Sequence, residues 1–343
     1  MKASIEHMDE KKLAADVVVV GAGVIGLAIA LEMQARGAQV VVVERGEAMQ
    51  QASSAAAGML AVDDSGNPAE LLPLARLSVE LYPEFLGRVE ALSGLAVPFQ
   101  TETTLQYSEG GVVRLAERSV DPRQLARGLV AAVRAAGILV LERTMLKAVE
   151  DLGGELRMDA GSGPEIVAKK MVYAAGAWAG DVAGMGALPV TPRKGQMLRV
   201  RVPEGLALNE VHRSERVYVV PRTAGPQAGT ALIGATVEDV GFDVAVHAED
   251  LTRLRGLAAE LVPEVGSEMD APMVEAWAGL RPATPDGLPV LGASESPRRF
   301  IAIGHYRNGV LLAPATAIVM ADLLMGKMPA VDLGAFSPRR FAR

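Results

Sequence analysis

The stretch VVVVGAGVIGLAIALEMQARGAQVVVVE, residues 17–44, decides the fold. It opens with four consecutive valines, a β-branched run typical of a strand that is covered on both faces. A glycine-rich turn follows, and then a helix-compatible segment, Leu27–Arg36, which Gly37 can end. A second valine-rich strand, Gln39–Val43, comes directly before Glu44. Strand, turn, helix and strand in this order predict the first unit of a parallel α/β sheet.

The turn between strand and helix, Gly21-Ala22-Gly23-Val24-Ile25-Gly26, is a dinucleotide-binding fingerprint. Its glycines permit a tight turn and close backbone approach, and the N-terminus of the following helix can receive a pyrophosphate. Glu44 lies 18 residues after Gly26, where a carboxylate can hold ribose hydroxyls. Because Glu44 is acidic, a 2′-phosphate is disfavoured, so the pattern predicts FAD or NAD rather than NADP.

The composition excludes several classes of protein. Half of the 343 residues are hydrophobic and 22% are charged, which indicates one large or two interleaved folded domains. There is no cysteine, so disulfides, thiolate metal sites and cysteine nucleophiles are excluded. None of the four histidines is spaced from another as metal ligands are, so we expect no metal site. The net charge of −7 and the lack of a basic stripe predict no nucleic-acid partner.

We expect no membrane partner and a cytoplasmic location. The longest strictly apolar run, Val17–Leu31, has 15 residues and includes three glycines, so it is too short to cross a bilayer. The residues before this run lack the layout of a secretory signal.

The rest of the chain predicts two kinds of layer. Pro122–Ala136 reads as a helix with Asp121 as its N-cap, and Met171–Ala174 reads as another buried strand. From Pro189 to Ala283 the pattern changes to short alternating strands interrupted by one helix, which favours an antiparallel sheet. Parallel-type segments lie at both ends of the chain. The fold class is therefore α/β (α+β overall), a Rossmann-like domain interleaved with an antiparallel-sheet domain.

Four segments resemble the glycine oxidase branch of the D-amino-acid oxidase superfamily. They are the start of the fold (17–44), SSAAAGML (53–60), WAGLRPATPDG (277–287) and GHYRNGVLLAPAT (304–316), and the resemblance extends with gaps over nearly the whole chain. It implies noncovalently bound FAD and a homo-oligomer. It also implies a discontinuous FAD-binding domain, 16–80, 120–188 and 284–343, with a substrate-binding domain formed by 81–119 and 189–283.

The resemblance further implies which residues hold FAD. Ala/Ser/Gly residues dominate the segment before Leu60, and small side chains let a backbone lie close to a flat ring. At the nucleotide end, the expected cofactor contacts are Gly21, Gly23, Val24, Ile25 and Gly26 at the pyrophosphate turn, Glu44 and Arg45 at the adenosine, and Val149 at the adenine. At the flavin end they are Ala52, Ser53, Ala57, Gly58 and Met59 along the flavin, and His305, Tyr306, Arg307, Asn308, Gly309, Val310 and Leu311 beside the isoalloxazine ring. Gly176 is a further expected cofactor contact.

Two arginines in apolar, Pro/Gly-punctuated surroundings are candidates for the substrate site. Arg281 ends the apolar run 276–280, and Arg307 sits in a turn before the last helix. Either guanidinium is a partner in a structural ion pair or a receptor for a carboxylate, which it matches with two parallel hydrogen bonds. The resemblance implies that Arg281 holds the substrate carboxylate, that Tyr218 adds a hydrogen bond, and that Arg307 and Met59 belong to the same catalytic group.

The activity implied by the resemblance is oxidation of glycine, sarcosine or a small D-amino acid. Hydride passes from Cα to flavin N5, the imine hydrolyses to a 2-oxo acid and ammonia, and dioxygen is reduced to hydrogen peroxide. The imine from glycine would feed formation of the thiamine thiazole. Three alternatives stay open: an FAD-dependent dehydrogenase or tailoring oxidase for a larger N-substituted amino acid, a non-catalytic flavin-binding subunit, and an NAD dehydrogenase.

One departure from the family pattern concerns the substrate side. Between Tyr107 and Arg114 the family usually carries several tens of additional residues, which are missing here. The departure leaves FAD binding little affected and bears on the size of the substrate, on lid behaviour and on oligomeric contacts.

Overall fold

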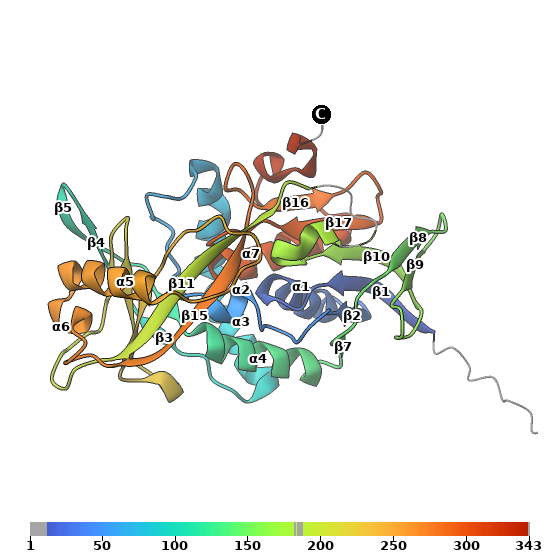
Figure 1. The fold of residues 1–343 in the computed structure, drawn as a ribbon. Helices are drawn as coiled ribbons and strands as arrows, with labels where there is room; N and C mark the ends of the chain where they lie inside the picture. The colour runs from blue at the N-terminus through green and yellow to red at the C-terminus, as the bar shows by residue number, and fades with distance from the viewer. Residues whose placement is uncertain (1–11, 182, 184–187, 342–343) are drawn as a thin grey trace, which may run out of the picture.

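The computed structural model describes residues 12–181, 183 and 188–341. Two sheets dominate this part of the chain, and Figure 1 shows them in two lobes, with β1, β2, β10 and β17 on the right and the long strands β11 and β15 reaching to the left. The expected combination of a Rossmann-like layer and an antiparallel sheet is confirmed. Residues 182, 184–187 and 342–343, which fall within the predicted domains, lie outside the described residues.

The first sheet is parallel at its centre, as the valine runs predict. Val17–Val20 pair in register with Val40–Val43, and these strand ends are buried on both faces. The sheet order is β16-β17-β10-β1-β2-β7, with the hairpin β8–β9 attached to β10. The strands are β1 (Leu13–Val20), β2 (Val40–Val43), β7 (Leu139–Leu141), β8 (Ala148–Asp151), β9 (Leu156–Asp159), β10 (Ile166–Tyr173), β16 (Val290–Ala293) and β17 (Arg299–Ile303).

Four helices cover one face of this sheet with a continuous apolar core. They are α1 (Val24–Ala35), α3 (Leu72–Ser93), α4 (Pro122–Ala135) and α7 (Gly309–Leu324). The predicted cap of α4 is confirmed, because the side chain of Asp121 accepts a hydrogen bond of 2.9 Å from the backbone N–H of Arg123. In the described part of the chain, no helix is both long enough and apolar enough to cross a membrane.

Side chains of helix α3 supply hydrogen bonds to the backbone of helix α7 where a proline interrupts the helical pattern. Pro314 lies inside α7 and has no N–H, so the carbonyl of Val310 lacks its helical donor. The hydroxyl of Tyr82 donates to that carbonyl at 2.5 Å. One residue further, Ser78 Oγ donates to the carbonyl of Leu311 at 2.6 Å and accepts from the N–H of Ala315 at 3.2 Å. Two fully buried side chains of α3 thus fix the start of α7.

The second sheet has the order β15-β11-β14-β13-β12-β4-β5 and is antiparallel except between β12 and β4. Helix α5 packs on it and forms a separate apolar core. Its strands are β4 (Thr104–Ser108), β5 (Gly111–Leu115), β11 (Thr191–Arg201), β12 (Val211–Arg213), β13 (Tyr218–Arg222), β14 (Thr230–Gly234) and β15 (Met273–Ala283). The remaining elements are β3 (Phe99–Thr101), β6 (Ser119–Val120), α2 (Ala52–Ala55), α5 (Ala248–Leu261), α6 (Pro263–Gly266) and the 3-10 turns Ala69–Leu71, Gly176–Asp181, Gly225–Gln227, Gly334–Phe336 and Pro338–Phe341.

Two features of this part bear on the sequence predictions. The predicted domain boundary at 80/81 falls inside the continuous helix α3, and the division into domains stays a prediction. The shortened segment after Tyr107 is a tight hairpin, in which β4 and β5 pair from Thr104 with Leu115 to Ser108 with Gly111. The chain therefore closes here without any gap in the sheet.

The Tyr82 hydrogen bond predicts a measurable contribution to stability. Tyr82→Phe leaves the buried carbonyl of Val310 without a donor, which should lower the free energy of unfolding by about 1–3 kcal/mol. The measurement is urea unfolding followed by circular dichroism. Tyr107→Phe is the matched control, because it removes a half-buried hydroxyl that water can replace. Equal stability of the Tyr82 variant and the unmodified protein would show that the carbonyl needs no side-chain donor.

Candidate active site

A cavity of about 540 Å³ lies between the two sheets, at the carboxyl ends of β1, β2 and β10. Ligands of open α/β sheets bind at this edge, so the location itself favours a binding site. Most residues predicted as site residues line it: Gly21, Gly23, Val24, Ile25, Glu44, Arg45, Ala52, Ser53, Ala57, Gly58, Met59, Gly176, Tyr218, Arg281, His305, Tyr306, Arg307, Asn308, Gly309 and Val310.

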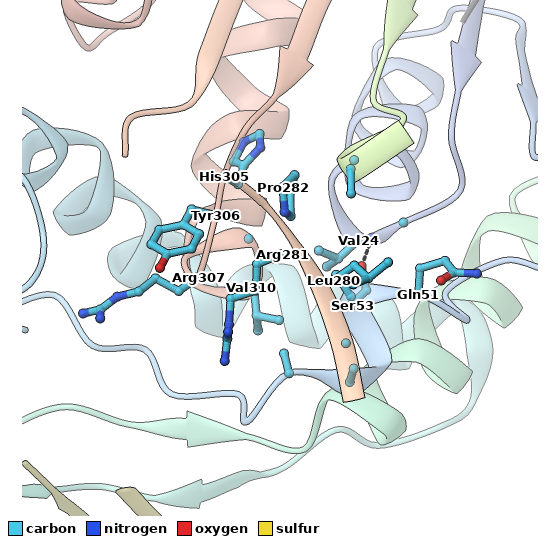
Figure 2. Close-up of a pocket in the computed structure, with 18 of the residues that line it drawn as sticks. Val24, Gln51, Ser53, Leu280, Arg281, Pro282, His305, Tyr306, Arg307 and Val310 are labelled. Atoms are coloured by element: carbon cyan, nitrogen blue, oxygen red, sulfur yellow. Dashed lines mark hydrogen bonds between the residues drawn. The ribbon is translucent and has the colours of Figure 1, made fainter. Parts of the chain in front are cut away.

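The glycine-rich turn lines the cavity, and two of its glycines, Gly21 and Gly26, are sterically required. A Cβ at Gly21, where φ is +109°, would lie 2.4 Å from the carbonyl oxygen of Ala174. A Cβ at Gly26 would lie 1.9 Å from the carbonyl oxygen of Gly21. Gly26 therefore lies behind the turn and outside the lining. The backbone N–H of Val24, in the first turn of α1, donates to Ser53 Oγ at 3.0 Å (dashed line in Figure 2).

Glu44 is held in a fixed orientation at the carboxyl end of β2. Its Oε2 accepts from the backbone N–H of Ala22 at 2.8 Å, and its Oε1 accepts from that of Gly46 at 2.8 Å. Each carboxylate oxygen keeps a lone pair for a further donor. The side chain is thus placed to receive ribose hydroxyls while it stabilises the glycine-rich turn.

An aromatic stack closes the cavity near Arg45. The Arg45 guanidinium lies 4.1 Å from the ring centroid of Trp178, and Trp178 stacks on Phe242 at 5.5 Å with the planes 26° apart. Trp178 lines the cavity. Phe242 comes from the loop after β14, so the stack joins the two lobes beside Arg45.

Two side chains of the second sheet donate hydrogen bonds to backbone carbonyls of the small-residue segment 52–59. Trp277 Nε1 donates to Ala55 at 3.1 Å, and Arg222 Nη2 donates to Ala57 at 2.8 Å. Gly58 has φ of +86°, and a Cβ there would lie 2.1 Å from the carbonyl oxygen of Val120. The backbone is therefore fixed, and only small side chains of this segment face the cavity next to Met59. A glycine cradle, a placed carboxylate and a flat small-residue wall fit FAD.

Arg281 enters the cavity from β15 of the second sheet and makes only neutral contacts. Its Nη1 donates to the carbonyls of Lys194 at 3.3 Å and Thr236 at 3.1 Å. A Cβ at Gly195 would lie 2.2 Å from its Nη2, so glycine is needed for the arginine to cross β11. Within the described residues, Arg281 forms no ion pair. Of the two possibilities for this guanidinium, the geometry favours the anion receptor.

Arg307 differs, because a carboxylate already compensates it. Its Nη2 donates to Asp64 Oδ1, and the side chain is partly exposed to solvent. Figure 2 shows Arg281 and Arg307 leaving adjacent segments in different directions. Asp64 was missed in the sequence, where DDSGN at 63–67 reads as an ordinary polar loop. For Arg307 the ion pair is the arrangement that the structure shows.

Tyr218 and His305 have protonation states that burial fixes. The Tyr218 hydroxyl donates to Met197 Sδ at 3.1 Å. Burial raises the pKa of Tyr218 and the Arg281 charge opposes that shift, so the phenol stays protonated near neutral pH. Burial lowers the pKa of His305 to about 3, so its imidazole is neutral there. His305 Nε2 lies 3.2 Å from Thr316 Oγ1, as expected of a structural histidine beside the cofactor rather than a general base.

The structure separates two further predicted residues from the cavity. Val149, expected at the adenine, lies on β8 outside the lining, and its carbonyl accepts from Arg299 Nη2 at 3.2 Å. The preceding residues 144–146 line the cavity, and the adenine contact at Val149 stays a prediction. Leu311 is buried in α7, where its carbonyl is bonded to Ser78.

Comparison with known proteins agrees with this geometry. The family of FAD dependent oxidoreductases (DAO) matches residues 16–118 and 97–323. The glycine oxidase of Geobacillus kaustophilus is 33% identical over 95% of this chain and 97% of its own length. That of Pseudomonas aeruginosa is 34% identical over 94% of this chain and 98% of its own length. The bifunctional ThiO/ThiG protein of Nostoc sp. is 35% identical over 90% of this chain but only 52% of its own length. The chain thus spans about half the length of such bifunctional relatives.

Solved structures give the same assignment. The crystal structure of glycine oxidase from Geobacillus kaustophilus superposes with a TM-score of 0.89 at 31% identity, and the match covers 96% of this chain and 100% of that one. The chain belongs to the family of FAD-dependent oxidoreductases, whose cofactor is FAD.

Proposed function

We propose that this protein oxidises glycine or a small N-alkyl glycine or D-amino acid, with FAD as hydride acceptor and dioxygen as final oxidant. The products are an imine, which hydrolyses to a 2-oxo acid and ammonia, and hydrogen peroxide. The observation that carries the proposal is Arg281, a cation without an acidic partner among the described residues, in the same cavity as the glycine-rich turn. The similarity to proteins named glycine oxidase over nearly their full length supports it.

In this proposal each residue at the substrate end has a separate task. Arg281 binds the substrate carboxylate in two parallel hydrogen bonds, and Tyr218, which stays protonated, donates one more. Met59 and Tyr306 border the space left for the amine and Cα. FAD, when bound noncovalently along 52–59, supplies the acceptor for the hydride and its electron pair. Orientation by the protein replaces an unfavourable bimolecular encounter, which accounts for much of the acceleration.

The wider role belongs to the same proposal. The match to about half the length of a ThiO/ThiG protein supports an imine product that serves formation of the thiamine thiazole. A homo-oligomer and a cytoplasmic location are proposed on the family resemblance and on the sequence. Peroxide release from purified yellow protein with glycine, sarcosine and D-alanine is the first test, with FAD identified after denaturation. Flavin bleaching without peroxide would instead indicate a dehydrogenase.

A larger N-substituted amino acid is a second candidate substrate. The tight β4–β5 hairpin favours it, because the substrate-side sheet here lacks the additional residues that the family usually carries. This candidate predicts slow turnover of glycine and fast turnover of a bulky N-alkyl glycine by the same yellow protein.

The role proposed for Arg281 predicts a large kinetic defect. Arg281→Met should lower kcat/KM for glycine, because the substrate carboxylate loses a desolvated charged partner. The decrease corresponds to a loss of roughly 2–5 kcal/mol of transition-state stabilisation. Bound FAD should stay in place, because Arg281 comes from the second sheet and makes no hydrogen bond to the glycine-rich turn or to the segment 52–59. Arg193→Met is the matched control: Arg193 pairs with Arg281 across the sheet, lies outside the lining and faces the exposed Asp239. Normal glycine turnover by the Arg281 variant would refute the proposed carboxylate anchor.

The pKa shifts predict the form of the pH profile. Only a substrate whose amine is neutral can release hydride. The value of kcat/KM for glycine should therefore rise with pH, as a larger fraction of the free substrate loses its ammonium proton. His305 adds no step between about pH 5 and 8, because its lowered pKa of about 3 keeps it neutral throughout that range. Binding of methoxyacetate, which has no amine, should vary little over the same range. A separate histidine step near pH 6.5 in either profile would contradict the neutral state of His305.

A further inference from the structure

The cavity wall that carries Arg307 holds a row of alternating charges. Arg307 donates to Asp64 Oδ1, and the other carboxylate oxygen of Asp64 lies 3.8 Å from Arg213 Nε. Arg213 Nη1 in turn lies 2.9 Å from Glu117 Oε2. Arg213, Asp64 and Arg307 all line the cavity. Each of the two arginines on this wall therefore has an acidic partner.

The position of Asp64 is determined by its own loop. The N–H of Gly66 donates to Asp64 Oδ1 at 2.8 Å, which orients the carboxylate toward Arg307. A Cβ at Gly66 would lie 2.8 Å from Arg307 Nη2, so the absence of a side chain leaves room for the guanidinium. Asn308 Nδ2 also donates to Asn67 Oδ1 at 2.9 Å. The two loops thus stay joined by a second contact that does not depend on the Asp64 charge.

The two ends of the substrate region therefore differ in charge. Arg281 has no acidic partner among the described residues and is held by neutral groups, whereas Arg307 is neutralised by Asp64. A ligand with one carboxylate can satisfy Arg281. A second carboxylate on the same ligand would meet Arg307 together with the like charge of Asp64, and like charges placed side by side select against a partner.

We propose that Asp64 is a specificity-determining residue, which neutralises Arg307 and thereby restricts the site to substrates with a single carboxylate. The proposal rests on the function proposed above, since it assigns Arg281 to the first carboxylate. It follows that removing the Asp64 charge frees Arg307 to receive a second anionic group. The substrate class gained is that of N-(carboxymethyl) amino acids, with iminodiacetate as the simplest member.

Two unreactive ether analogues test the proposal without any turnover. Methoxyacetate is the oxygen analogue of sarcosine, and diglycolate that of iminodiacetate. Their dissociation constants are measured from the change in flavin absorbance of the FAD-loaded protein. In Asp64→Asn the affinity for diglycolate relative to methoxyacetate should increase by about tenfold or more, the scale of one new charged contact.

Two further variants show whether the effect comes from this ion pair. Asp63→Asn makes the same change one residue away, on an exposed side chain outside the cavity lining, and should leave the ratio unchanged. The double variant Asp64→Asn with Arg307→Met should lose the gain in diglycolate affinity. No unpaired cation then remains on this wall for the second carboxylate, because Arg213 is paired with Glu117. Bound FAD and its absorbance spectrum report that each variant is folded.

The outcomes separate this proposal from the function it rests on. An unchanged ratio in Asp64→Asn, an equal gain in Asp63→Asn, or a gain that survives Arg307→Met would each overturn the role of Asp64. So would failure of both analogues to bind any of the proteins. If the expected shift occurs while the unmodified protein releases no peroxide with glycine or sarcosine, the charge selection stands and the proposed oxidase activity is wrong. Turnover of iminodiacetate by Asp64→Asn is the corresponding kinetic readout.

Discussion

The contact between Gly21 and the carbonyl oxygen of Ala174 is the constraint on which the rest of the molecule depends. A Cβ at position 21 would lie 2.4 Å from that oxygen, so the ends of β1 and β10 approach each other only because a side chain is absent. The same turn starts α1 and places the N–H of Ala22 on Glu44. Turn, helix start and carboxylate are thus a single unit. A side chain at Gly21 would therefore disturb the FAD site and the centre of the parallel sheet together.

What could be predicted from the sequence is what neighbouring residues determine. The valine runs of β1 and β2, the glycine-rich turn and the Asp121 cap are local patterns, and the structure has them where they were expected. The lining of the cavity by Arg281 and Tyr218 followed from a family resemblance rather than from any local rule. No periodicity or spacing in this chain distinguishes Arg281 from a structural arginine.

What could not be predicted depends on partners far apart in the sequence. Ser78 and Tyr82 bond to carbonyls of α7 that are 233 and 228 residues away, and only the packing of α3 on α7 brings them together. The Asp64–Arg307 pair spans 243 residues. Residues 144–146 also line the cavity, and they come from the loop before β8, whose start no local pattern in the sequence specifies. Lining residues on loops are harder to predict than those at strand ends, because no periodicity marks them.

The contrast between the two arginines explains how one cavity can be both selective and stable. A cation without a counterion is destabilising to the extent that it is buried, because the protein replaces only part of the hydration it loses, and Arg281 is half-buried. Arg281 bears this penalty with two carbonyl contacts, so a substrate carboxylate that reaches it gains a partner that no other described residue competes for. Arg307 carries the same charge, but it is paired with Asp64 and therefore attracts an anionic ligand group less strongly. On the roles proposed for Arg281 and Asp64, the number of unpaired cations, rather than the number of arginines, determines how many anionic groups a substrate of this site carries.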